Sequence, residues 1–241
     1  MAAMLRPGLL VLLGAMLWGL AGTSMAADRL TATRLDYRER ETGVDPYPVR
    51  ILVTPAFLRS DDGDDAGDFL LLDRHSRRLY SVSRDNHEIL VVEPPPARLT
   101  DARRRPPAME MKVERDPAAP AIAGHAVASF RLQAGGKVCD RGAVALGLLP
   151  DAVQALREYR AVLAGRQFRD WFKTPAEFRT PCFLASYIYG IARDLDYGLP
   201  LQERRWDGRD RILVDFRSGV QVPAGLFRLP PGFRRFHIQR P

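Results

Sequence analysis

The sequence is poor in the residues that most often carry chemistry. It has two cysteines, four histidines and, among 36 basic residues, only three lysines. His87-Glu88 begins like the zinc motif His-Glu-x-x-His, but position 91 is Val, and no other histidine stands at metal-ligand spacing. A Gly-x-Ser-x-Gly elbow, a phosphate-binding loop and a dinucleotide fingerprint are also absent. We therefore expect no catalytic residues, no metal and no cofactor, which favours a protein that is not an enzyme.

Long apolar runs are missing after the first 27 residues, which argues against a polytopic membrane protein. The apolar run 8–22 follows Arg6 and precedes the small residues Ser24 and Ala26, as in a secretory signal peptide. About 15 apolar residues are too few for the roughly 20 that a membrane anchor needs. The sequence predicts a signal peptide over 1–26, cleavage after Ala26, and one exported domain over 27–241 with no transmembrane segment.

The formal net charge of +7 comes from arginines that are scattered along the chain. Only residues 103–105 form a run of three, inside a proline-rich stretch over 94–107 that predicts a long exposed loop. Arginine suits phosphate or carboxylate recognition, but a general compositional bias explains the excess equally well. Export and the scatter together argue against a nucleic-acid partner.

Cys139 and Cys182 are the only cysteines and both belong to the exported part of the chain. An even pair in an oxidising compartment favours a disulfide. No Cys-x-x-Cys motif is present, so the bridge is expected to be structural.

Alternating β-forming residues between turn-prone segments predict an antiparallel sheet. Proline at 55 predicts an edge strand, a bulge or a break within the run 49–58, Gly135-Gly136 predicts a turn, and Asp207-Gly208 predicts a hairpin. The residues Ile212, Val214 and Phe216 are expected on one face of the last strand. The predicted strands cover 30–40, 49–58, 68–73, 78–83, 88–93, 109–114, 125–133, 199–206 and 211–217.

One amphipathic helix is predicted over 150–164, where Leu149, Val153, Leu156 and Leu163 recur at helical spacing and Gly165 is the expected stop. Residues 182–192 are apolar without a clear period, so a buried strand and a short helix both remain open.

Five aspartates gather between Asp61 and Asp68, and their oxygens are of the kind that calcium prefers. The glycine at 63 and the lack of a closing Glu do not match an EF-hand, so a solvated turn is the favoured interpretation.

The C-terminal part carries a family resemblance in three places: Gly198-Leu199-Pro200-Leu201, Asp207-Gly208, and the stretch 222–233 with Leu226-Phe227 and Leu229-Pro230. These segments resemble the end of Lol-type lipoprotein-sorting carriers. The runs 57–63, 69–74 and 79–82 resemble hairpins of uncharacterised periplasmic members of that superfamily. The resemblance implies an α+β fold, with a strongly curved antiparallel sheet, or incomplete β-barrel, covered by the helix, and a concave apolar face that accepts acyl chains.

Three functions follow as hypotheses. The first is a periplasmic, non-catalytic carrier of a lipid-like or acylated ligand, a lipoprotein included. The second is a structural or protein-interaction component of the cell envelope, with a barrel interior filled by its own side chains. The third is an enzyme with a dispersed site. Aromatic residues could line an apolar cavity or belong to the core; they are Phe57, Phe69, Tyr80, Trp171, Trp206 and Phe216.

Overall fold

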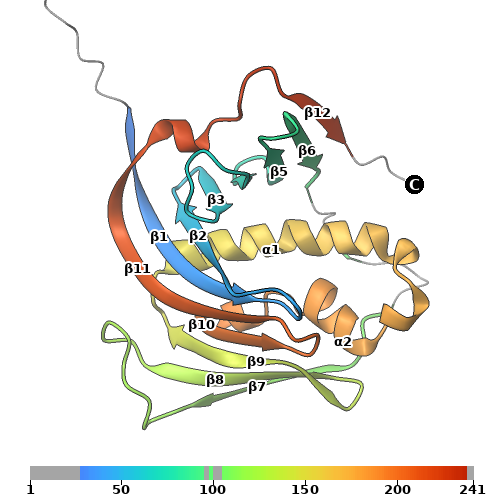
Figure 1. The fold of residues 1–241 in the computed structure, drawn as a ribbon. Coiled ribbons are helices and arrows are strands. Elements are labelled where there is room, and N and C mark those ends of the chain that lie inside the picture. Colours follow the sequence, from blue (N-terminus) through green and yellow to red (C-terminus); the bar gives the residue numbers. More distant parts are fainter. Residues whose placement is uncertain (1–27, 95–97, 100–104, 238–241) are drawn as a thin grey trace, which may run out of the picture.

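A single open sheet curves around one long helix in the computed structural model of the chain, which describes residues 28–94, 98–99 and 105–237. Figure 1 shows the helix α1 (Pro150–Asp170) lying between the two halves of this sheet. The predicted signal peptide over 1–26, its cleavage site and part of the 94–107 loop fall outside the described residues. No helix in the described part is long and apolar enough to cross a membrane.

The sheet has 12 strands in the order β12-β6-β5-β4-β3-β2-β1-β11-β10-β9-β8-β7. All neighbours are antiparallel except β12 and β6, which are parallel. The strands are β1 (Arg29–Arg40), β2 (Tyr47–Val53), β3 (Phe57–Asp61), β4 (Phe69–Asp73), β5 (Arg78–Ser83), β6 (Glu88–Val92), β7 (Met109–Arg115), β8 (Val127–Ala134), β9 (Lys137–Leu146), β10 (Gly198–Arg205), β11 (Asp210–Pro223) and β12 (Arg234–His237).

The expectation of an antiparallel sheet is confirmed, and the fold is mostly sheet. In the meander β2 to β6, the predicted strands 68–73, 78–83 and 88–93 correspond to β4, β5 and β6. The predicted run 49–58 is divided at Pro55 between β2 and β3, and β3 continues to Asp61. Gly135 and Gly136 both adopt positive φ at the turn between β8 and β9, as does Gly208 between β10 and β11. These positions favour glycine because a Cβ atom disfavours that conformation.

The prediction that Ile212, Val214 and Phe216 share one face of β11 is wrong. The register with β1 skips Val214, since Tyr37 pairs with Leu213 and Asp36 pairs with Asp215. A β-bulge of this kind shifts the alternation of side chains by one residue. Phe216 therefore packs against the core, while Ile212 and Val214 remain 48% and 61% exposed.

The helix differs from its prediction in two respects. It continues past Gly165 to Asp170, where Phe168 is buried and Arg166 pairs with Asp170 at 2.5 Å. It is also not the strongly amphipathic helix that was expected, because small residues and Arg160 occupy much of its buried side. The buried positions are Ala152, Ala155, Leu156, Arg160, Val162, Ala164, Gly165 and Phe168.

The undecided segment 182–192 begins as a helix. α2 (Pro181–Leu184) continues directly into a π-helical turn, η3 (Ala185–Tyr189). Thr180 caps α2 by accepting a hydrogen bond from the Phe183 N–H at 3.1 Å. Short 3₁₀ turns complete the helical elements: η1 (Trp171–Lys173), η2 (Ala176–Phe178), η4 (Asp194–Asp196) and η5 (Ala224–Phe227).

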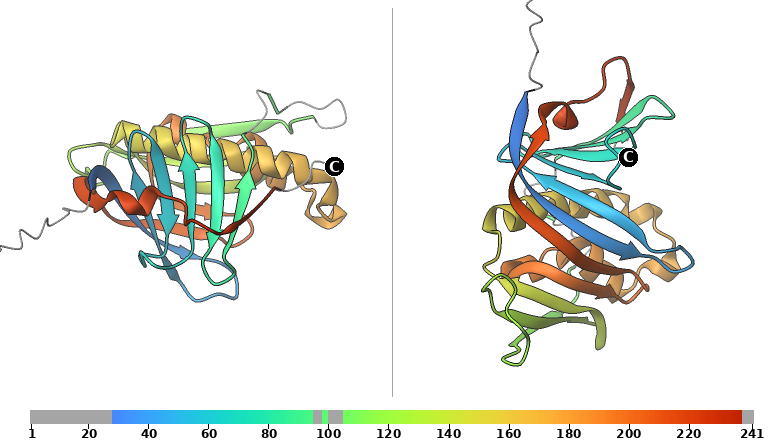
Figure 2. Two further views of the ribbon diagram at one scale, coloured as in Figure 1. Left: turned by 90° about the horizontal axis from the view of Figure 1, so that it is seen from above. Right: turned by 60° about the vertical axis from the view of Figure 1, so that its left-hand side comes forward.

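Two hydrophobic cores lie on opposite faces of the meander. Figure 2 shows the elements that cover these faces, with α1 on one side and η5 on the other. On the inner face, Leu35, Leu58 and Leu72 pack with Leu156 and Val162 of α1. On the outer face, a second core is covered by η5 and the segment that follows it; this core contains Leu52, Phe69, Leu71, Val82, Ile89, Val91, Leu226 and Phe227. Strands buried on both faces explain why runs such as Phe69-Leu70-Leu71-Leu72 lack polar alternation.

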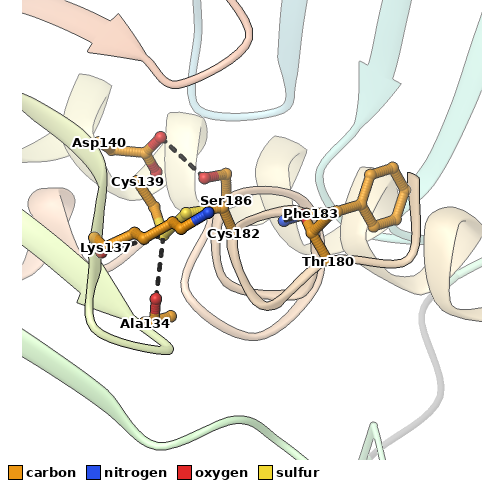
Figure 3. Close-up of a disulfide and its surroundings, with 8 residues drawn as sticks. All are labelled: Ala134, Lys137, Cys139, Asp140, Thr180, Cys182, Phe183 and Ser186. Atoms are coloured by element: carbon orange, nitrogen blue, oxygen red, sulfur yellow. Dashed lines mark hydrogen bonds between the residues drawn. A yellow bond between two sulfur atoms is a disulfide. The ribbon is translucent and has the colours of Figure 1, made fainter. Parts of the chain in front are cut away.

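The predicted disulfide is confirmed: Cys139 and Cys182 are bridged, with their Cα atoms 5.0 Å apart (Figure 3). Cys139 sits beside a register shift in the β8–β9 hairpin, and Cys182 lies on α2. The bridge therefore joins the helical segment to the sheet.

We predict that replacing both cysteines by serine lowers the free energy of unfolding by about 4 kcal/mol, because the bridge closes a loop with a sequence separation of 43. Urea unfolding of the double variant measures this difference. Thiol counting on the unreduced, denatured wild-type protein is the companion measurement, and two free thiols there contradict the bridge.

Candidate functional site

A hollow of about 320 Å³ opens beside α1, between the helix and strands β1, β10 and β11. Its walls are mostly charged rather than apolar. The lining residues are Glu39, Arg40, Glu41, Tyr159, Arg160, Leu163, Gln167, Tyr187, Ile191, Glu203, Arg205, Arg209, Asp210 and Arg211. We call it the inner hollow.

Arg160 forms the deepest charged group of the inner hollow, with a side chain only 5% exposed. Its Nη1 donates to both carboxylate oxygens of Asp194, at 2.8 and 2.9 Å, and to the Ile191 carbonyl at 3.0 Å. Its Nη2 donates to both oxygens of Glu203, each at 2.8 Å. Both terminal nitrogens of the guanidinium are thus engaged by protein groups, and these bonds join α1 to η4 and β10.

The pKa values of the two carboxylates that share Arg160 are shifted in opposite directions. Burial raises the pKa of Asp194 to about 6. Burial also opposes ionisation of Glu203, but Arg160, Arg211 and Arg205 outweigh it and lower the pKa of Glu203 to about 2. Glu203 therefore stays ionised to a lower pH than Asp194.

We predict that Arg160→Ala costs about 3–5 kcal/mol of stability, because it leaves the buried Asp194 without its counter-ion and removes from Glu203 the cation that binds both of its oxygens. Arg157→Ala is the matched control, since Arg157 lies one turn earlier and pairs with Asp196, whose side chain is 56% exposed. That change is expected to cost less than about 1 kcal/mol. Urea unfolding of both variants compares them, and equal costs contradict the structural role of Arg160.

Asp140 lies next to the disulfide and accepts a hydrogen bond from Ser186 Oγ at 2.8 Å (Figure 3). Burial is the main reason that the pKa of Asp140 is raised to about 6. An acid whose pKa is raised by folding favours the folded state only while it is protonated. The contribution of Asp140 to the free energy of unfolding is therefore fully present below about pH 4 and is lost as the pH rises through about 6.

The variant Asp140→Asn retains an acceptor for Ser186. We predict that its free energy of unfolding, relative to that of the wild type, rises by about 2 kcal/mol between about pH 4 and pH 7. Asp73→Asn is the control of opposite sign. Hydrogen bonds from Ser76 and His75 outweigh burial and lower the pKa of Asp73. That variant should therefore lose stability relative to the wild type as the pH rises, and most of this change should fall below about pH 4. Thermal unfolding from about pH 2 to pH 7 measures both variants, and a flat profile for Asp140→Asn between about pH 4 and pH 7 refutes the expectation.

A second hollow, of about 300 Å³, lies on the outer face of strands β7 to β10. Four cations line it, and we call them the cation row: Lys112, Arg131, Arg141 and Arg204. Glu114 is the one acidic residue among its lining residues, which also include Ser129, Phe130, Gly142, Ala143 and Gln202.

Gly142 allows β9 and β10 to approach closely under this hollow. A Cβ atom at this position would lie 1.8 Å from the Gln202 carbonyl oxygen. Only glycine avoids that collision, and the resulting register pairs Arg141 with Arg204.

The histidines do not form a catalytic arrangement with either hollow. His125 contacts the Leu146 carbonyl at 2.8 Å, and His237 contacts Glu93 at 3.0 Å on the exposed edge. Neither hollow is lined by histidine. Among the described residues, no group of three or more His, Cys, Asp and Glu could hold a metal ion.

The Asp61–Asp68 segment is a turn, as favoured. Asp61 binds Arg50 at 2.8 Å and also pairs with Arg59. Asp62 and Asp64 each accept a backbone N–H at 2.9 Å. Their oxygens are therefore engaged within the protein.

The six aromatic candidates line neither hollow. Phe57, Phe69 and Tyr80 belong to the outer core of the meander, and Phe216 packs against the inner core. Trp171 packs against Phe183, and Trp206 is 39% exposed. Among the described residues, four of the six thus belong to the cores of the sheet, and none lines either hollow.

No family model and no curated protein matches the chain. Among solved structures, an uncharacterized conserved protein from Thermus thermophilus is similar with a TM-score of 0.41 and 11% identity, over 86% of this chain and 91% of that chain. Two crystal forms of PNGF-II are similar with TM-scores of 0.39 and 0.40 and identities of 8% and 10%, over 87% of this chain but only 31% and 32% of theirs. The chain thus spans about a third of PNGF-II.

The residues that form these two sites were not identified as site residues from the sequence. In the sequence, Arg160 is only a charged residue between the apolar helix positions Leu156 and Leu163. The members of the cation row are far apart in the chain, and only the strand register brings them together.

Proposed function

We propose that this protein is a non-catalytic binding protein of the bacterial periplasm, whose barrel interior is filled by its own helix and which acts through its surfaces. One observation carries the proposal: the inner face of the curved sheet packs against α1, in a single core that includes Leu35, Leu58, Leu72 and Leu156. This is the arrangement expected for an interaction component of the envelope. The resemblance to Lol-type carriers and the disulfide support an exported location.

A lipid carrier is the competing function, and the geometry favours it less. An acyl chain needs a groove lined mainly by apolar side chains. Both the inner hollow and the outer hollow are lined mainly by polar and charged residues. To reach the inner core, an acyl chain would have to displace α1 and separate Arg160 from Asp194 and Glu203.

Native mass spectrometry of the protein purified from the periplasm tests this proposal. The expected result is the mass of the bare chain 27–241 with its disulfide intact, and no uptake of a fluorescent fatty-acid probe. Organic extraction of the same sample should release no stoichiometric lipid. An acyl-bearing ligand at one equivalent would instead establish a carrier and overturn the filled-interior proposal.

A further inference from the structure

We propose that the outer face of β7 to β11 docks onto an anionic lipid surface, with the cation row binding the phosphate groups of the lipids. The inference rests on the proposed function, because it names the partner of a protein that acts through its surface. It concerns the outer face of the sheet and needs no ligand inside the barrel.

The cation row runs straight across four neighbouring strands. Lys112 is in register with Arg131, Arg131 with Arg141, and Arg141 with Arg204. Neighbouring strands lie about 4.8 Å apart, so the four cations span about 14 Å. All four are exposed and alternate with buried or half-buried neighbours along their strands, which places them on one face.

The middle of the cation row has no counter-ion of its own. Lys112 pairs with Glu110 at 3.4 Å, and Arg204 pairs with Asp210 at 2.8 Å. Among the described residues, neither Arg131 nor Arg141 forms an ion pair or a side-chain hydrogen bond. Like charges directly opposite one another destabilise a sheet. Folding therefore gains nothing from placing Arg131 against Arg141, whereas an external anion would relieve their repulsion.

Exposed apolar side chains flank the cation row on the same face. Ile212 is in register with the exposed residues Gln202 and Arg38, next to the row, and is 48% exposed. Val138 is in register with Gln133 on the other side of the row and is 41% exposed. Trp206 follows Arg204 by two residues and is 39% exposed.

The cation row together with the exposed apolar side chains beside it favours a membrane, rather than a soluble anion, as the partner of this face. Clustered cations attract anionic lipid headgroups, and adjacent apolar and Trp side chains suit the interface between headgroups and acyl chains. A free phosphate would use the arginines but not the apolar flanks. The arginine guanidinium also binds phosphate through two parallel hydrogen bonds, which lysine cannot do.

Vesicle flotation tests the proposal, using the mature wild-type protein and vesicles of equal parts phosphatidylglycerol and phosphatidylcholine. The protein should float with these vesicles at low salt and not with pure phosphatidylcholine. Each basic residue near an anionic surface contributes about fivefold to partitioning. The double variant Arg131→Gln/Arg141→Gln should therefore bind about 30-fold more weakly. Its thermal stability should not fall, because the change removes a repulsive pair of exposed charges.

The matched control is Arg228→Gln/Arg234→Gln, which removes the same charge outside the cation row. Arg228 follows η5, and Arg234 lies on β12, at the edge of the sheet opposite β7. Both arginines are highly exposed, at 72% and 74%, and their ion pairs within the described residues are with Asp28 and Glu88. This variant should retain vesicle binding within about twofold. Equal weakening by both double variants would mean diffuse attraction to net charge, and the docking face would be wrong.

Two further measurements separate the sources of phosphate. Titration with glycerol phosphate, and with dextran sulfate as an acidic polymer, should each give much weaker binding than vesicles give. Tight binding of either one without vesicle binding overturns the membrane assignment. A failure to bind vesicles with an empty interior refutes this inference alone, while an acyl ligand found inside the barrel refutes the proposed function.

Discussion

The ion network around Arg160 fixes how the helix sits in the sheet. One guanidinium joins α1 to Asp194 of η4 and to Glu203 of β10, all of them nearly excluded from solvent. Buried ion pairs contribute little net stability compared with apolar packing, but removing one member leaves a costly unpaired charge. A helix whose buried side is rich in alanine can slide or rotate at little cost, whereas Arg160 meets both carboxylates in one position only. The network therefore defines the geometry of the inner hollow and the filling of the barrel.

Local features of the fold could be predicted from the sequence, and non-local ones could not. The break between β2 and β3 follows from Pro55, and the turn between β8 and β9 follows from Gly136; the effect of such residues is confined to a few neighbours. The parallel pairing of β12 with β6 and the bulge at Val214 depend on contacts between distant segments. The helix was predicted to stop at Gly165 because glycine often ends a helix, but the burial of Phe168 and the Arg166–Asp170 pair extend it.

The candidate sites were harder to predict than the strands, because their residues also come from segments that are distant in the sequence. Cys139 and Cys182 could be paired because only one pairing exists. Arg160 has its acidic neighbours 34 and 43 residues away. Arg131 and Arg141 are placed opposite each other only by the register of the β8–β9 hairpin, where a bulge at Cys139 changes which side chains share a face. Arginine thus occupies two contrasting environments: Arg160 is paired with two carboxylates inside the curved sheet, whereas Arg131 and Arg141 have no counter-ion among the described residues on its outer face.

The pairing of β1 with β11 joins the first strand of the described chain to one of its last, with Arg29 opposite Pro223. Contacts between residues so far apart in sequence form late, because a long loop must close before they stabilise the chain. Until β11 arrives, β1 presents an unpaired edge of the kind that promotes association between chains. Folding of this protein is therefore expected to be slow, and its most vulnerable intermediate is a half-sheet whose free edge later becomes the centre of the finished molecule.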